Sequence, residues 1–221
     1  MFHVEHALRD ELTRKIRTRM GGRRRIGLLG GSFNPAHEGH RDISLAALSY
    51  LDLDEVWWLV SPQNPLKPEK GMASFEDRMA GARAMAHHPR IRVTGIERTL
   101  GTRYTADTLR KLITRFPSCQ FVWLMGADNL AQIATWRDWT RIFHLTPIAV
   151  FDRPTYTSKA LTSLAARRFH RSRRREAALK TLAATPAPAW VFVHHRLNPI
   201  SATQIRAERA RRQASRSKSG D

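Results

Sequence analysis

Residues 26–40 read IGLLGGSFNPAHEGH, an apolar run that is followed by paired glycines, a proline and two histidines. The apolar run predicts a buried strand, and the longer stretch of helical period after it predicts a helix that begins near Gly39 or His40. Gly30 and Gly31 would then lie in the first strand-to-helix turn, where the lack of a Cβ lets backbone N–H groups approach a phosphate. In open α/β folds this turn lies at the carboxyl edge of the sheet, where ligands bind.

The two histidines of this stretch indicate an anion site. His37 and His40 are three residues apart, so both can project to one side of the helix entry and donate hydrogen bonds to phosphate oxygens. If both are protonated, they would also suit a charged transition state. The pair alone also fits a capped helix start or a weak metal pair, but only Glu38 lies near enough to be a third ligand, and it should point elsewhere. We therefore expect no metal bound by the protein.

Apolar runs rich in β-branched and aromatic residues alternate with longer stretches of helical period along the rest of the chain. This alternation predicts an α/β fold with a Rossmann-like, doubly wound parallel sheet in a single domain. The expected strands are 25–29, 55–60, 91–95, 120–125, 147–151 and 190–194. The expected helices are 75–87 with Ser74 at its start, one that runs from Thr105 and ends before Pro117, a long basic helix over 158–183, and 202–212.

The two ends of the chain differ in composition from its centre. Residues 1–24 form a basic extension, 25–206 form the expected nucleotide-binding domain, and 207–221 form a basic tail whose serines and glycine predict disorder. Because Met20 lies just before the first strand, it is a candidate for the native start. The intact mass of the natively expressed protein tests this hypothesis.

The formal net charge of +19 favours partners that carry phosphate, but its sign does not choose among nucleotides, nucleic acid and acidic membranes. Much of the excess lies at 14–25, 167–175 and 209–218, which we expect to be solvated faces or tails, with polyanion binding as the alternative. The chain has no apolar run long enough for a membrane helix and no apolar signal core before residue 25. Because Cys119 is also the only cysteine, we expect a cytoplasmic protein without an internal disulfide.

Two common phosphate-binding fingerprints are absent from the chain. It has neither Gly-x-x-x-x-Gly-Lys-Ser/Thr nor Gly-x-Gly-x-x-Gly, which excludes a P-loop enzyme and a standard dinucleotide dehydrogenase. A second candidate phosphate site lies at residues 200–206, which read ISATQIR. Ser201 and Thr203 at a helix start, with Arg206 one turn later, would present hydroxyls, N–H groups and a guanidinium to a phosphate.

Residues 31–40 resemble the first signature of the HxGH nucleotidyltransferase superfamily, and residues 200–206 resemble its C-terminal signature. Three further stretches, YTADTL at 104–109, GADNL at 126–130 and WRDW at 136–139, are similar to the nicotinate-nucleotide adenylyltransferase family. The last two are not expected in phosphopantetheine adenylyltransferases or cytidylyltransferases, which share the histidine signature. Residues 62–67 also resemble the substrate loop of the family.

The resemblance implies roles for individual residues. His37, His40 and Arg206 would be catalytic, by stabilising the charge on the transferring group. Asp128 would accept hydrogen bonds from the ribose hydroxyls. The residues implied in ATP binding are Gly30, Gly31, Ser32, Phe33, His37, His40, Asp128, Ser201, Thr203 and Arg206.

The same resemblance implies an acceptor site built from Asn34, Lys67, Tyr104, Thr105 and Trp136. Trp136 would stack on a pyridine ring, and Thr105 would offer its backbone N–H to the carboxylate of that ring. Lys67 would meet the phosphate of the acceptor.

The implied reaction is attack by the phosphate of nicotinate mononucleotide on the α-phosphorus of ATP, with pyrophosphate leaving in line. Mg²⁺ would enter as the cofactor with the ATP phosphates. ATP and nicotinate mononucleotide would be the partners, with no membrane and no nucleic acid, and the residues do not reveal the oligomeric state. Nicotinamide mononucleotide is the alternative acceptor. From another class, a nucleic-acid-binding module on a nucleotide-binding fold is the alternative that the net charge of +19 permits.

Overall fold

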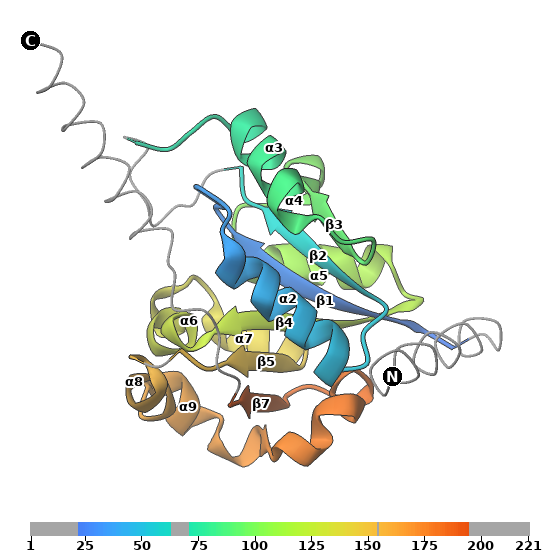
Figure 1. Cartoon of the computed structure of the whole chain (residues 1–221). Coiled ribbons are helices and arrows are strands. Elements are labelled where there is room, and N and C mark those ends of the chain that lie inside the picture. Colours follow the sequence, from blue (N-terminus) through green and yellow to red (C-terminus); the bar gives the residue numbers. More distant parts are fainter. Residues whose placement is uncertain (1–21, 63–70, 154, 195–221) are drawn as a thin grey trace, which may run out of the picture.

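Seven strands form one sheet in the part of the chain that the structure describes, which is residues 22–62, 71–153 and 155–194 (Figure 1). In this computed structural model every pair of neighbouring strands is parallel, and the strand order is β3-β2-β1-β4-β5-β7-β6. The strands are β1 (Arg24–Gly31), β2 (Glu55–Val60), β3 (Ile91–Thr94), β4 (Cys119–Gly126), β5 (Ile148–Phe151), β6 (Arg173–Arg174) and β7 (Trp190–Val193).

The strand order makes the sheet doubly wound. The chain starts in the middle at β1, moves outward through β2 to β3, and then returns to add β4 on the other side of β1. The connections on the two sides of this point leave the sheet in opposite directions, so the carboxyl ends of β1 and β4 border a crevice. The predicted Rossmann-like α/β fold is confirmed.

Helices cover both faces of the sheet, with α2 across one face and α5 on the other (Figure 1). The described α-helices are α2 (Glu38–Tyr50), α3 (Phe75–Ala86), α4 (Ile96–Leu100), α5 (Thr105–Arg115), α6 (Ala127–Gln132), α7 (Trp139–Leu145), α8 (Thr157–Leu161) and α9 (Leu164–Arg168). The described 3₁₀ helices are η1 (Ile133–Thr135), η2 (His170–Ser172) and η3 (Glu176–Ala184).

Successive apolar residues of the five inner strands, β2, β1, β4, β5 and β7, alternate between two hydrophobic cores. Leu29 and Trp58 pack with residues of α2, α3 and η3 on one face. Leu28 and Trp57 pack with residues of α5, α6 and α7 on the other. Because both faces of these five strands are buried, the strands are largely continuous apolar runs, which is why such runs predict them correctly.

The bounds of the elements agree well with the sequence pattern. The expected strands differ from the observed ones by at most two residues at an end, and β5 begins after Pro147 because proline has no N–H to donate to the ladder. Ser74 caps α3 as predicted, since its Oγ accepts a hydrogen bond of 3.0 Å from the Asp77 N–H. At α5, however, the N-cap is Tyr104, and no side chain caps the helix. The expected helix over 202–212 lies outside the described residues.

The prediction of one long helix over 158–183 is wrong. The segment forms α8, α9, η2, β6 and η3 instead. A new helix, α9, begins at Leu164 with Ser163 as its N-cap, whose Oγ accepts a 3.2 Å hydrogen bond from the Ala166 N–H. At the end of α9 the carbonyl of Phe169 accepts a 2.8 Å hydrogen bond from the Trp190 indole, and β6 then pairs with β7. These tertiary bonds replace the helical ones that the basic, alanine-rich pattern favours.

Gly30 and Gly31 are the last two residues of β1, so they precede the turn in which the sequence pattern places them. A Cβ on Gly30 would lie 2.5 Å from Cη2 of Trp123, a buried residue of the neighbouring strand. The space that glycine leaves here is therefore filled by an indole of the protein itself. Packing alone requires glycine at position 30.

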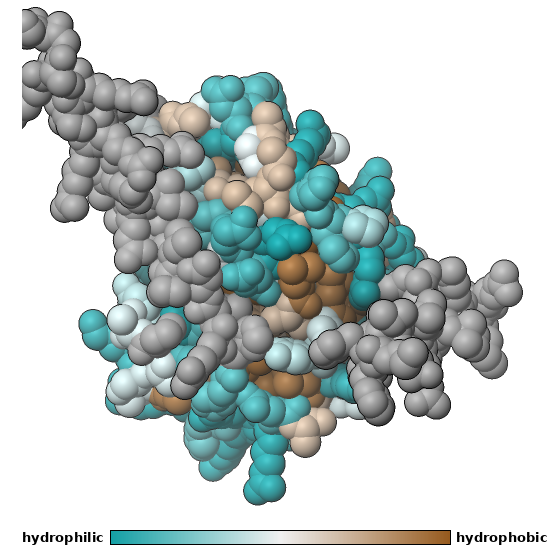
Figure 2. Space-filling view, viewed as in Figure 1, coloured by the Kyte–Doolittle hydropathy of each residue, from teal (hydrophilic) through white to brown (hydrophobic). Residues whose placement is uncertain are grey.

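Hydrophilic residues cover most of the face seen in Figure 2, around smaller hydrophobic areas. Among the described residues, the large hydrophobic side chains that are exposed are Tyr50, Tyr156 and Leu164. Within the same residues, none of the helices is both long and apolar enough to span a bilayer.

Replacing Gly30 by alanine should lower the free energy of unfolding by about 1–3 kcal/mol, because the new methyl group overlaps the Trp123 ring. The matched control is Gly81→Ala in α3, where a Cβ would meet nothing within 4 Å. That substitution should raise stability by up to about 1 kcal/mol through helix propensity. Urea denaturation of both variants measures the difference, and equal stabilities would contradict the packing argument.

Candidate functional site

The turn between β1 and α2 is held by an aromatic anchor. Phe33 is buried and stacks on Trp58, with ring centroids 5.0 Å apart. The Trp58 indole in turn donates a 2.7 Å hydrogen bond to Oγ of Ser44 in α2. Phe33 has a φ of 47°, a left-handed conformation that is strained for a bulky residue and that this packing compensates. Since the Phe33 ring belongs to the core, only its backbone is available for a ligand.

The two histidines lie together at the start of α2. Their ring centroids are 3.9 Å apart, and His37 is the N-cap of a helix that begins at Glu38, slightly earlier than predicted. The His37 backbone N–H donates a 3.2 Å hydrogen bond to Nδ1 of His40. In the neutral His40 ring the proton therefore resides on Nε2, which can donate to a ligand. The Phe33 ring, at 4.7 Å, fixes the orientation of this imidazole.

His37 is neutral near pH 7. Burial and, to a smaller extent, the positive charge of Arg153 lower the pKa of His37 to about 4. Its Nδ1 atom is buried and has no hydrogen-bond partner within the described part of the chain. The idea that both imidazoles are protonated is therefore wrong for this structure. The histidines supply N–H donors rather than two positive charges.

Asp128 lies across the crevice, at the second position of α6 directly after β4. Its Oδ1 is buried without a hydrogen-bond partner among the described residues and lies 3.4 Å from Nε of Arg153. Gly126 makes this arrangement possible, because a Cβ at that position would lie 2.4 Å from the same oxygen. A carboxylate directly after β4 lies where a ribose-binding acid is expected, and its binding of ribose hydroxyls stays a prediction.

Arg153 is a residue of this site that the sequence analysis missed. It follows β5 by two residues, and its carbonyl accepts a 2.7 Å hydrogen bond from the Tyr156 N–H at the entry to α8. This turn anchors the backbone of Arg153 while its guanidinium reaches Asp128. The sequence did hold a signal for this residue, because Arg153 is an arginine just after a strand that ends near the point where the strand order reverses.

Two of the five predicted acceptor residues, Tyr104 and Thr105, lie at the start of α5, and Trp136 belongs to a stretch that lies beside them. The guanidinium of Arg137 lies 4.6 Å from the centre of the Tyr104 ring, which brings the WRDW stretch beside the YTADTL stretch. Trp136 is half-buried and packs against the same core as α5. The Thr108 N–H donates the first helical hydrogen bond, to the Tyr104 carbonyl, so the N–H groups before it, including that of Thr105, have no helical acceptor. N–H groups of this kind at a helix start can bind an anion.

A buried carboxyl group forms hydrogen bonds that stabilise the start of α5. Glu97 in α4 accepts a 3.1 Å hydrogen bond from the Thr108 hydroxyl, which also lies 2.9 Å from the hydroxyl of Thr102. The Glu97 carbonyl accepts a 2.9 Å hydrogen bond from the Thr102 N–H. Burial raises the pKa of Glu97 to about 7, and the Thr108 hydrogen bond opposes part of this rise. Nothing in the sequence pattern pointed to Glu97.

The structure places Ser32 in the same turn as Phe33, at the carboxyl end of β1. The Asn34 side chain braces the backbone, since its Nδ2 donates to the Gly71 carbonyl and its Oδ1 accepts from the Ala73 N–H, each at 3.2 Å. Its contact with a substrate stays a prediction. The remaining predicted site residues, Lys67, Ser201, Thr203 and Arg206, lie outside the described residues.

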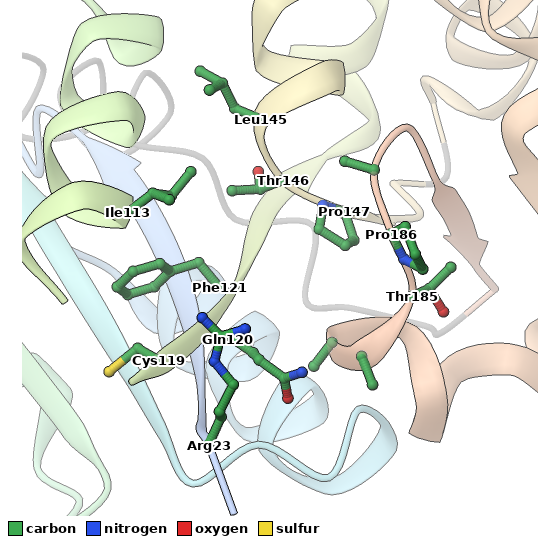
Figure 3. Close-up of a pocket in the computed structure, with 13 residues that line it drawn as sticks. Arg23, Ile113, Cys119, Gln120, Phe121, Leu145, Thr146, Pro147, Thr185 and Pro186 are labelled. Carbon is green, nitrogen blue, oxygen red and sulfur yellow. The ribbon is translucent and has the colours of Figure 1, made fainter. Parts of the chain in front are cut away.

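A cavity of about 300 Å³ lies away from this site (Figure 3). It is bordered by Cys119 and Gln120 at the start of β4 and by Pro147 just before β5. The amino ends of these strands are at the edge of the sheet opposite to the crevice, so the cavity is distinct from the candidate site. Within the described residues no three His, Cys, Asp or Glu side chains are grouped as metal ligands.

A family model described as cytidylyltransferase-like matches residues 28–208 of the chain. A protein of Methylorubrum extorquens strain PA1, named "Probable nicotinate-nucleotide adenylyltransferase", is 52% identical over 182 residues, which cover 82% of this chain and 98% of that protein. A protein of the same name from Gluconacetobacter diazotrophicus is 52% identical over 196 residues, which cover 89% of this chain and 91% of the relative.

The fold is also similar to solved structures. The Plasmodium falciparum nicotinic acid mononucleotide adenylyltransferase complexed with NaAD aligns with a TM-score of 0.62 and covers 83% of each chain. At 16% sequence identity, this likeness supports the fold alone.

Replacing Glu97 by glutamine should increase stability at alkaline pH and not at acid pH. The pKa of Glu97 in the folded protein, about 7, is above its ordinary value of 4.5, so its contribution to stability is lost as the pH rises from 4.5 through 7. Glutamine does not ionise, and the free energy of unfolding of Glu97→Gln relative to the parent should rise by about 1–3 kcal/mol between pH 5 and pH 8. Urea denaturation at several pH values measures this, and parallel curves would rule the expectation out.

Proposed function

The chain belongs to the nicotinate-nucleotide adenylyltransferase family, and we propose that it transfers the adenylyl group of ATP to nicotinate mononucleotide, releasing pyrophosphate and forming nicotinate adenine dinucleotide for NAD biosynthesis. The observation that carries this proposal is the identity of 52% to a family member over 98% of that member's length. The two residue clusters of the site support it, because one suits a nucleoside triphosphate and the other suits an aromatic ring with an anionic group.

The reaction needs positioning and charge stabilisation rather than a base. The attacking phosphate of the acceptor is already ionised, and pyrophosphate leaves from the α-phosphorus in line. The His40 Nε2–H and the imidazole of His37 would donate hydrogen bonds to the phosphate oxygens as charge develops. Asp128 would accept hydrogen bonds from the ribose hydroxyls and so align the nucleotide. Arg206 would act on the triphosphate from the C-terminal signature.

Proposed acceptor recognition centres on the start of α5. The free N–H groups there and the positive end of the helix dipole favour the carboxylate of nicotinate over the neutral amide of nicotinamide. Trp136 would stack on the pyridine ring. Nicotinamide mononucleotide remains the alternative acceptor, whereas membership of this family disfavours a nucleic-acid-binding module.

Family membership implies that a metal assists catalysis, and we propose that the metal is Mg²⁺. Since the described residues hold no group of three metal-binding side chains, the ion would be carried by the ATP phosphates, a mode that suits Mg²⁺ because it retains several waters. When bound, it would neutralise charge on the leaving pyrophosphate. We place the reaction in the cytoplasm on the sequence features alone.

The direct test compares pyrophosphate release from ATP and Mg²⁺ with three acceptors, which are nicotinate mononucleotide, nicotinamide mononucleotide and phosphopantetheine. We expect the highest kcat/KM with nicotinate mononucleotide. A preference for nicotinamide mononucleotide would overturn the proposed acceptor and keep the chemistry. Release with none of the three would overturn the reaction.

Replacing His40 by alanine should lower kcat by about 100- to 1,000-fold, the usual effect of removing one donor that stabilises the transition state. The control is His170→Ala, which removes an exposed imidazole in η2 and should leave kcat within about twofold. Circular dichroism checks that both variants fold. Wild-type turnover in His40→Ala would remove His40 from the mechanism.

A further inference from the structure

An arginine in α3 is almost completely buried beside the site. Arg78 is 3% exposed, and its guanidinium donates hydrogen bonds to four backbone carbonyls. The donors and acceptors are Nη1 to Ser32 at 2.7 Å and to Ser61 at 2.8 Å, Nη2 to Pro62 at 2.9 Å and Nε to Ala73 at 3.2 Å. The planar fork of arginine matches this set of acceptors, and a lysine ammonium does not.

No carboxylate of a described residue forms a salt bridge that neutralises the charge of Arg78. Within the described residues no carboxylate lies within 4.0 Å of its nitrogens, and its neighbour Glu76 acts on it only at longer range. Burial lowers the pKa of Arg78, but a guanidinium stays charged at every physiological pH. A buried cation without a counterion is costly, so a hydrophobic residue would serve packing alone at lower cost.

The four carbonyls belong to three segments that meet at the carboxyl edge of the sheet. Ser32 follows β1 in the turn that carries the two histidines, whereas Ser61 and Pro62 follow β2 directly. Ala73 lies just before α3. The Ser61 N–H also donates a 2.9 Å hydrogen bond to the Gly31 carbonyl, so the ends of β1 and β2 are joined twice.

The hydrogen bonds to Arg78 fix the orientation of the peptide groups as well as their position. Because the Ser32 carbonyl points at Arg78, the N–H of the same trans peptide, which belongs to Phe33, points away from it. Asn34 secures the turn from the other end through Gly71 and Ala73. The backbone between β1 and α2 is therefore fixed by a charged side chain from a different helix.

We propose that Arg78 is a positioning residue for adenylyl transfer, which fixes the turn carrying His37 and His40 relative to the segment that leaves β2. This inference rests on the proposed function. In this role Arg78 does not touch the reacting atoms. It holds donor groups where the transition state needs them, and displacements near 1 Å at such groups cost about a hundredfold in rate.

The chain offers a matched control at the opposite edge of the sheet. Arg90 also donates to backbone carbonyls, from Nε to Asp54 at 3.1 Å and from Nη2 to Leu53. These carbonyls precede β2 at its amino end, away from the histidines. Replacing either arginine by lysine keeps the positive charge and removes the planar guanidinium that donates to several carbonyls.

The experiment measures kcat, the KM for each substrate and the free energy of unfolding for Arg78→Lys and Arg90→Lys. We expect both variants to lose some stability. Arg78→Lys should lower kcat at least tenfold and raise the KM for ATP, because the histidine turn shifts. Arg90→Lys should keep kcat and both KM values within about twofold.

The inference is overturned if Arg78→Lys retains kcat and KM within about threefold, or if Arg90→Lys lowers kcat as much as Arg78→Lys. If Arg78→Lys does not fold, Arg78→Gln, measured below its own melting temperature, takes its place with the same expected result. Calorimetric binding of a non-hydrolysable ATP analogue separates this inference from the proposed reaction. Weaker binding to Arg78→Lys than to Arg90→Lys supports the inference even if no acceptor is adenylylated, and equal binding in that case contradicts it.

Discussion

The pairing of β1 with β4 is the constraint on which the candidate site depends. The two strands are in register from Arg24 with Cys119 to Leu29 with Leu124. Because the connections after them leave on opposite sides of the sheet, the turn before α2 and the start of α6 meet at one edge. Both faces of each strand are buried, so a change of register would disrupt both cores at once. The double burial therefore fixes which residues reach this edge of the sheet.

The candidate site offers an anion mostly oriented donors and less formal charge. His37 is neutral at physiological pH, and the free N–H groups at the start of α5 carry only partial charges. The guanidinium of Arg153 reaches the crevice, while that of Arg78 acts through the backbone. Donors that are already in place need little reorganisation during the reaction, which is the main source of electrostatic catalysis. The large net charge of +19 is thus a poor guide to where a phosphate site is proposed.

Particular residues show which parts of the structure sequence patterns predict and which they do not. Apolar runs locate the strands because strands buried on both faces have no polar alternation to obscure them, and Ser74 caps α3 through a local bond. The pattern fails at 158–183, where Phe169 and Trp190 bond across 21 residues. It also misassigns Gly30, which makes room for Trp123 on a strand that is distant in sequence. Local signals are readable, whereas contacts between distant segments are not.

The sequence by itself determined the class of fold, the motifs of the family and the placement of the histidine turn and Asp128 at the carboxyl edge, because each of these depends on spacing within one short segment. Only the tertiary structure decided which groups are charged, which glycines serve packing, and which side chains hold the site in place. The neutrality of His37, the raised pKa of Glu97 and the four carbonyl bonds of Arg78 all arise from burial among segments far apart in the chain. Burial is a property of the assembled core, and no local pattern encodes it.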